Sequence, residues 1–206
     1  MPRANKVFIP KEELSLEVIK QYRVHCPGDR DKAKFLKDLF PMAEKLCQTM
    51  VFVKTRESCR ELYETLRKEG WSVSALEGGM PGDQRDRIVS EFREGKTKIM
   101  VATDVLSRGF DVSQISLVVN YDPPVQVLTD ANGRHTGSEP AYETYMHRIG
   151  RSGRFGRKGA AFNLWTGDRE RHVLDKIEEY FAHKIQEVHC EDEESVEKIL
   201  QEAELA

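Results

Sequence analysis

The chain has 206 residues, of which 39% are hydrophobic and 33% are charged. This composition is typical of a globular domain with a substantial core, and it excludes fibrous and disordered classes. The formal net charge is −3, so the chain lacks the general basic excess of a dedicated nucleic-acid-binding protein, and any such role depends on local charge. No apolar run approaches the roughly 18 residues of a membrane span, and the amino-terminal residues lack the apolar stretch of a secretory signal. We therefore expect no membrane contact, and we expect a monomer.

The cysteines are spaced irregularly and form no C-x-x-C pair; they are Cys26, Cys47, Cys59 and Cys190. Two of them follow a histidine, at His25 and His189. Adjacent residues in a helix or strand rarely share one face, so these pairs have poor spacing for metal ligands. We expect neither a metal site nor a disulfide framework, and a reducing compartment such as the cytosol or nucleus.

Short apolar runs alternate with segments of helical periodicity along most of the chain. The predicted strands occupy residues 18–24, 49–53, 71–76, 99–102, 115–119 and 160–164. The predicted helices occupy residues 31–46, 58–68, 83–92 and 168–181. Strands of four to six residues between helices of ten to fifteen predict βαβ units and a parallel sheet. Because the strands are almost wholly apolar, we expect helices to cover both faces of the sheet.

We divide the chain into three parts. Residues 1–16 are predicted to be a linker, residues 17–186 a doubly wound α/β domain, and residues 187–206 an acidic tail. The tail contains apolar residues at helical spacing, which predict a short surface helix: Val196, Ile199 and Leu200.

One long segment interrupts the alternation of strands and helices. Residues 122–140 contain two consecutive prolines, an Asn-Gly pair and further glycine and proline. This composition predicts a loop. A loop of this length inside a compact domain is usually functional or mobile.

The strongest chemical signal is the segment 147–159, His-Arg-Ile-Gly-Arg-Ser-Gly-Arg-Phe-Gly-Arg-Lys-Gly. Arginine forks match phosphate oxygens, and glycines let a backbone approach a ligand closely. A dinucleotide fingerprint is excluded, because the glycines recur every third residue and precede a strand. The residues alone leave two interpretations open: a phosphate-binding site, or a solvated basic strip that has no catalytic role.

A second signal is the segment 102–111, Ala-Thr-Asp-Val-Leu-Ser-Arg-Gly-Phe-Asp. It follows an apolar strand directly, at the position where α/β folds place ligand sites. Taken alone, the same residues are also consistent with a capped turn between a strand and a helix.

The two segments together resemble motifs of the DEAD-box RNA helicases. Residues 147–154 match the family's last motif, H-R-x-G-R-x-x-R, and residues 102–111 match T-D-V-x-A-R-G-x-D, with Ser107 and Phe110 in place of the usual Ala and Ile. The order and spacing of the motifs also match, and the resemblance runs from about residue 16 to residue 187. It implies a RecA-like three-layer α/β sandwich with a mostly parallel central sheet.

The resemblance also implies an ATP site shared with a second domain. ATP and Mg²⁺ would be bound mainly by the N-terminal RecA-like domain of the same protein. Arg151 and Arg154 would act on the γ-phosphate as arginine fingers, and Asp111 and Gly109 would lie at the nucleotide, with Asp111 accepting a hydrogen bond from the ribose.

Two further sets of roles follow from the same matched positions. His147 and Arg148 would couple the two domains. Residues at matching positions would contact the RNA backbone: Thr55, Arg56, Gly78, Arg85, Thr103 and Arg108. Glu77 and Gly82 stand where the family usually has His and Gln, so no role is carried over to them.

The machinery that holds ATP is missing from this sequence. A P-loop needs G-x-x-x-x-G-K-[ST]. Gly95-Lys96-Thr97 supplies the second half of that pattern, but Ser90 occupies the first glycine position. This segment also runs from helix to strand, so we interpret Gly95 as a helix stop. No Asp-Glu-Ala-Asp occurs.

Finer features resemble the mRNA-export helicases that work at nuclear pores. They are the Pro-Pro pair after residues 120–122, the segment Tyr142–Met146, and Gln84 directly before Arg85. This resemblance implies RNA and a nuclear-pore export activator as partners, and a location in the cytoplasm and nucleus, at the pore. The alternative hypothesis is a stand-alone module that binds RNA or a partner protein without ATP turnover.

Overall fold

The structure is a computed structural model that describes residues 19–43, 47–104, 115–153 and 158–202. The strands are β1 (Ile19–His25), β2 (Gln48–Phe52), β3 (Val73–Leu76), β4 (Ile99–Ala102), β5 (Ile115–Asn120), β6 (Val125–Thr129), β7 (His135–Pro140), β8 (Gly159–Trp165) and β9 (Gln186–His189). The helices are α1 (Asp29–Ala43), α2 (Arg56–Lys68), α3 (Gly82–Arg93), α4 (Tyr142–Ile149), α5 (Asp168–Phe181) and α6 (Glu193–Glu202).

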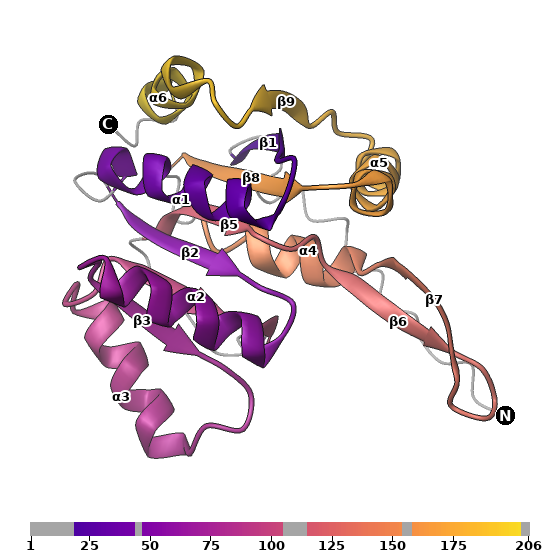
Figure 1. Cartoon of the computed structure of the whole chain (residues 1–206), viewed down its shortest axis with the longest axis horizontal. Coiled ribbons are helices and arrows are strands. Elements are labelled where there is room, and N and C mark those ends of the chain that lie inside the picture. The colour runs from indigo at the N-terminus through magenta and orange to yellow at the C-terminus, as the bar shows by residue number, and fades with distance from the viewer. Residues whose placement is uncertain (1–18, 44–46, 105–114, 154–157, 203–206) are drawn as a thin grey trace, which may run out of the picture.

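Seven strands form one sheet in the order β3-β4-β2-β5-β8-β1-β9, and every neighbouring pair is parallel. Helices lie against this sheet as outer layers (Figure 1). The predicted fold class, an α/β sandwich around a parallel sheet, is confirmed. Because the strands are parallel, all their carboxyl ends meet at one edge of the sheet.

Each face of the sheet carries its own apolar core. Alternate strand residues serve opposite faces, as Val51 and Met50 of β2 do. The core that contains Val51 also contains the buried residues of α1, α2 and α6. The core that contains Met50 also contains those of α3, α4 and α5. Two buried faces explain why the strands are apolar at almost every position rather than at every second one.

Helix α3 ends where the sequence predicts a helix stop. Gly95 has φ of 75° and donates its N–H to the carbonyl of Phe92 at 2.9 Å. Glycine adopts this left-handed conformation without the penalty of a Cβ. The chain then enters β4, so Gly95-Lys96-Thr97 joins a helix to a strand and is not a P-loop.

The prediction of a loop over residues 122–140 is wrong for most of that segment. Strands β6 and β7 pair as an antiparallel hairpin, which projects from the body of the domain in Figure 1. At its tip, Oδ1 of Asp130 accepts hydrogen bonds from the amides of Asn132 (2.9 Å) and Arg134 (2.8 Å), and Gly133 has φ of 75°. The polar and glycine residues that predicted a loop therefore form the turn of a hairpin.

The sheet continues past residue 186, where the sequence analysis ended the domain. Strand β9 pairs with β1 in parallel, with Val188 opposite Val24. Helix α6 follows and buries the three apolar residues that predicted it. The boundary after residue 186 therefore falls inside a strand, and the acidic segment contributes an edge strand and a covering helix.

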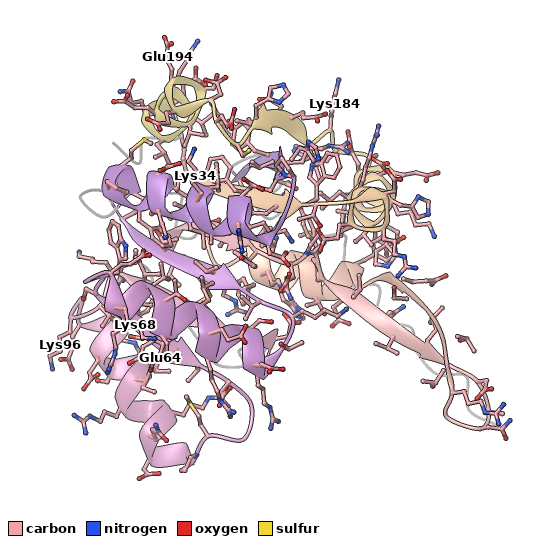
Figure 2. The ribbon with its side chains drawn as sticks, viewed as in Figure 1. Lys34, Glu64, Lys68, Lys96, Lys184 and Glu194 are labelled. Carbon is pink, nitrogen blue, oxygen red and sulfur yellow. The ribbon has the colours of Figure 1, made fainter. Side chains whose placement is uncertain are left out.

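Charged side chains are distributed over the outer surface of the domain. Figure 2 labels Lys34 on α1, Lys68 on α2 and Glu194 on α6, all of which are exposed. Within the described residues, every helix is too short or too polar to cross a membrane.

We predict that Leu200→Ala lowers the free energy of unfolding by about 2–4 kcal/mol, because it deletes buried methyl groups from the core that α6 shares with α1. Leu200 is only 1% exposed. Urea unfolding followed by circular dichroism measures the change. Lys198→Ala on the exposed face of the same helix is the control. Equal stability of the two variants would show that α6 is a dispensable tail.

Candidate functional site

Polar residues follow four neighbouring strands at the carboxyl edge of the sheet. Lys54 and Thr55 come after β2, Glu77 and Gly78 after β3, Thr103 and Asp104 after β4, and Tyr121 and Asp122 after β5. Parallel α/β sheets bind their ligands at this edge. The strand order therefore brings together residues that are far apart in the sequence.

Arg148 joins the two segments that carry the helicase resemblance. Its Nε and Nη2 donate to the two carboxylate oxygens of Asp104, at 2.6 and 2.9 Å. Its Nη1 donates to the carbonyl oxygen of Asp122 at 2.8 Å and to Oδ1 of Asn120 at 3.1 Å. The guanidinium also lies 5.1 Å from the ring centroid of Phe52. Arg148 is 2% exposed, and these contacts join helix α4 to the ends of β2, β4 and β5.

A row of buried polar side chains continues from Arg148 beneath α4. Asn120 donates through Nδ2 to Oδ1 of Asn163 at 2.8 Å, and the hydroxyl of Tyr145 donates to Gln21 at 2.7 Å. Nδ2 of Asn163 lies 3.4 Å from the hydroxyl of Tyr145 and connects the two pairs. Burial raises the pKa of Tyr145, so its hydroxyl stays a donor. This row was not predicted, although two asparagines in otherwise apolar strands are a signal of it in the sequence.

The segment after α4 depends on glycines for its close packing. A Cβ on Gly150 would lie 2.8 Å from the carbonyl oxygen of Met146, and a Cβ on Gly159 would lie 2.8 Å from the amide nitrogen of Gly153. Arg151 is 8% exposed, and its Nε donates to the carbonyl of His147 at 2.9 Å. The basic segment is therefore built tightly onto the end of α4 as far as residue 153.

The side chain of His147 lies on the exposed side of the same helix. Its Nε2 is 4.0 Å from a carboxylate oxygen of Glu143, one helical turn earlier. His147 is 48% exposed, whereas its neighbour Arg148 is buried. Of the two residues predicted to couple the domains, His147 faces outward, and the described contacts of Arg148 all lie within this domain.

Thr55, Arg56 and Gly78, which were predicted to contact RNA, lie close together. Thr55 caps α2, with its hydroxyl accepting the amide of Ser58 at 3.0 Å. The Arg56 guanidinium lies against the loop after β3, because a Cβ on Gly78 would come within 3.0 Å of Nη2. Gly79 has φ of 90° and is similarly close to Arg56. The glycines therefore let an arginine pack directly on backbone.

The other residues predicted to contact RNA are distributed more widely. Thr103 is 8% exposed, and its amide donates to the carbonyl of Leu76 at 3.1 Å. Arg85 is partly exposed in the first turns of α3. Four predicted residues lie outside the described part of the chain: Arg108, Gly109, Asp111 and Arg154.

A buried lysine that the sequence analysis missed lies beside this site. Lys32 of α1 is 1% exposed, and its Nζ lies 3.0 Å from a carboxylate oxygen of Glu170 and 3.7 Å from one of Asp122. Asp122 also accepts the backbone amide of Lys54 at 2.7 Å. Buried charges need such partners. In the sequence, Lys32 is one of many lysines and carries no distinguishing signal.

The two His-Cys pairs lie side by side, since His25 is opposite His189 in the parallel pair β1 and β9. Burial, together with the neighbouring Cys190, raises the pKa of Cys26 to about 12. Cys26 is therefore a thiol rather than the thiolate that binds metals. All four cysteines are free, and the described residues contain no group of three His, Cys, Asp or Glu side chains that could hold a metal ion.

We predict that Arg148→Met lowers the free energy of unfolding by about 2–4 kcal/mol, because it leaves buried acceptors without their donor. The side chain of Asp104 is 46% exposed, so water can hydrogen-bond to its carboxylate in the variant and offset part of the lost stability. Urea unfolding measures the change, with Arg169→Met at an exposed position of α5 as the control. Unchanged stability would show that the Arg148 contacts are not structural.

Comparison with known proteins agrees with this geometry. Residues 31–156 match the family described as "Helicase conserved C-terminal domain". The chain is 43% identical over 201 residues to DEAD-box ATP-dependent RNA helicase 38 of rice, and 40% identical over 199 residues to human ATP-dependent RNA helicase DDX19A. These matches cover 97% of this chain but only 38% and 40% of the relatives, so the chain spans about two fifths of their length.

Solved structures show the same likeness. A structure of S. cerevisiae Dbp5 bound to RNA and ADP BeF3 has a TM-score of 0.79 and 36% identity, covering 91% of this chain and 46% of that one. A structure of the C-terminal domain of the DEAD-box protein Dbp5 has a TM-score of 0.74 and 37% identity, covering 90% and 98%. The chain therefore belongs to the helicase C-terminal domain family, as a RecA-like domain related to the DEAD-box RNA helicases Dbp5 and DDX19.

Proposed function

We propose that this chain is the C-terminal half of an ATP-dependent DEAD-box RNA helicase that remodels RNA during mRNA export. The observation that carries the proposal is the set of hydrogen bonds from Arg148 to Asp104, Asn120 and Asp122. These bonds fix the basic segment after α4 to the carboxyl edge of the sheet, beside the segment that begins at Thr103. A rigid half-site of this kind is what a second domain needs in order to complete it.

The part of the half-site that would face the nucleotide is mainly basic. Arg151 and Arg154 would act as arginine fingers, and such fingers contribute about 10³–10⁵ in rate in phosphoryl transfer. Asp111 and Gly109 would hold the ribose end of ATP. When bound, ATP with Mg²⁺ supplies the phosphoryl group and the charge that the fingers neutralise. The N-terminal domain would hold most of that ligand, because this chain has no P-loop and no Asp-Glu-Ala-Asp.

The RNA side of the half-site would lie over α2 and the loop after β3. Thr55, Arg56 and Gly78 meet there at the N-terminus of α2, and helix N-termini attract phosphate. Thr103, Arg85 and Arg108 would extend this surface. Contacts to the RNA backbone hold RNA without reading its sequence. They need positive charge only at the contact surface, so a net charge of −3 for the whole chain does not oppose them.

The partners that we propose are those present in structures of a relative. Dbp5 of S. cerevisiae has been solved bound to RNA, to Gle1 H337R with IP6, and to Nup159 together with Gle1 H337R, IP6 and ADP. We propose an export activator of that kind as the partner of this chain, and a location in the cytoplasm and nucleus, at the nuclear pore. The working unit would be a monomer in which His147 takes part in coupling the two domains.

A reconstitution experiment tests the motor against a stand-alone binding module. This chain alone is expected to release little or no phosphate from ATP, because one half of the site is missing. Mixing it with the N-terminal half of a relative such as rice helicase 38 is expected to give RNA-stimulated phosphate release, measured by a coupled assay. Robust hydrolysis by the chain alone would exclude the two-half site. No activity from the mixture would favour the module.

A substitution tests the proposed finger. In a single chain that joins such an N-terminal half to this domain, Arg154→Ala is expected to lower kcat by about 10³ or more, while the affinity for a fluorescent ATP analogue changes little. Arg171→Ala, at an exposed position on α5, serves as the control and should leave both values unchanged. Loss of nucleotide binding by a correctly folded Arg154 variant would contradict the finger role.

A further inference from the structure

Glu77, which stands where the family usually has histidine, is a nearly buried carboxylate. It is the first residue after β3, and its side chain is only 9% exposed. Its Oε1 accepts hydrogen bonds from Nε and Nη2 of Arg60, at 2.9 and 2.5 Å. Its Oε2 is also buried and has no hydrogen-bond partner among the described residues. A carboxylate in this position needs a cation to offset its lost hydration, and Arg60 is that cation.

Arg60 itself extends into solvent, since its side chain is 68% exposed. The ion pair uses the Nε and Nη2 donors of its fork. No partner for Nη1 is found in the described part of the chain. The pair therefore presents its cationic side outward and keeps its anionic side in the protein. An arginine held in this way loses less side-chain freedom when it makes a further hydrogen bond.

Arg60 lies one helical turn after Arg56, and residues at this spacing share a face of a helix. The Arg56 guanidinium lies against Gly78 and Gly79, and the Arg60 guanidinium is bound to Glu77. Two arginines of α2 therefore contact consecutive residues of one loop, Glu77 to Gly79. The loop is at the carboxyl edge of the sheet, where the proposed RNA surface lies.

We propose that Arg60 is a further RNA-binding residue, which donates to a backbone phosphate, and that Glu77 is a positioning residue that holds the Arg60 fork in place. This inference rests on the proposed function, because it extends the RNA surface around Thr55, Arg56 and Gly78. It gives the Glu77 departure a role: the carboxylate does not touch RNA, and it acts through Arg60.

The salt dependence of RNA binding tests Arg60. The affinity of this chain for a fluorescent oligouridylate is measured by anisotropy between 50 and 200 mM KCl. Each phosphate contact on single-stranded RNA contributes about 0.7 to the slope of log affinity against log salt. Arg60→Gln is expected to reduce the slope by that amount and to weaken binding several-fold at low salt. An unchanged slope would overturn the proposal.

Two controls separate this proposal from the RNA surface on which it rests. Arg67→Gln changes an exposed arginine at the far end of the same helix, 3.8 Å from Glu64, and should leave the slope unchanged. Arg56→Gln should reduce it. If Arg56→Gln reduces the slope and Arg60→Gln does not, only the Arg60 proposal fails. If the unsubstituted chain shows no salt-dependent binding, the proposed RNA surface fails as well.

Substitutions at Glu77 test the positioning role against simple repulsion. Glu77→Ala removes the anchor of Arg60, so RNA binding is expected to weaken although a negative charge has been lost. Glu77→Gln keeps an acceptor for Arg60 and is expected to bind RNA at least as well as the unsubstituted chain. Tighter binding by Glu77→Ala would show that the carboxylate only repels RNA, and it would overturn the role.

A double substitution guards against misfolding. Arg60→Gln alone leaves a buried carboxylate with a weaker partner, and thermal unfolding shows whether the variant is stable. Arg60→Gln combined with Glu77→Gln removes both charges, and its slope should be reduced by the same amount as in the single variant. A normal slope in the stable double variant would contradict the phosphate contact.

Discussion

The arrangement of the site depends on one buried guanidinium. Arg148 of α4 satisfies acceptors at the ends of two strands, β4 and β5, and it is only 2% exposed. A buried charge is costly unless it is paired and hydrogen-bonded, so this side chain specifies one relative position for the helix and the sheet. Arg151 follows three residues later, so its position relative to the sheet is fixed by the same contacts. The position of the basic segment is therefore fixed by Arg148, near its own N-terminal end.

The parallel sheet gives the site its location. Each strand ends at the same edge, so Thr55, Gly78 and Thr103, which follow three different strands, all lie along this edge although they are far apart in the sequence. Two apolar cores hold the strands from opposite faces. The proposed RNA and nucleotide contacts are confined to the connections at one edge, because helices already cover both faces of the sheet.

The sequence was most informative where a pattern repeats or a motif is local. Apolar runs and helical spacing predicted six strands of the sheet and four helices to within a few residues, and the resemblance of residues 102–111 and 147–154 predicted the family. Contacts between distant segments left no local signal. Lys32 with Glu170 and Glu77 with Arg60 become visible only when their elements are packed together. The hairpin β6–β7 was missed because its turn residues dominated the composition of residues 122–140.

The proposed RNA surface suggests how an acidic protein could hold RNA. The net charge is set by exposed carboxylates spread over many helices. Bound RNA, in contrast, interacts mainly with the side chains that it contacts. At ordinary salt, charges more than about 10 Å away are largely screened. Placing the carboxylate partner of Arg60 in the protein interior lowers the net charge without presenting an anion to the ligand. A departure from a family motif can thus preserve the chemistry of a surface, provided that the new side chain is buried and its partner is not.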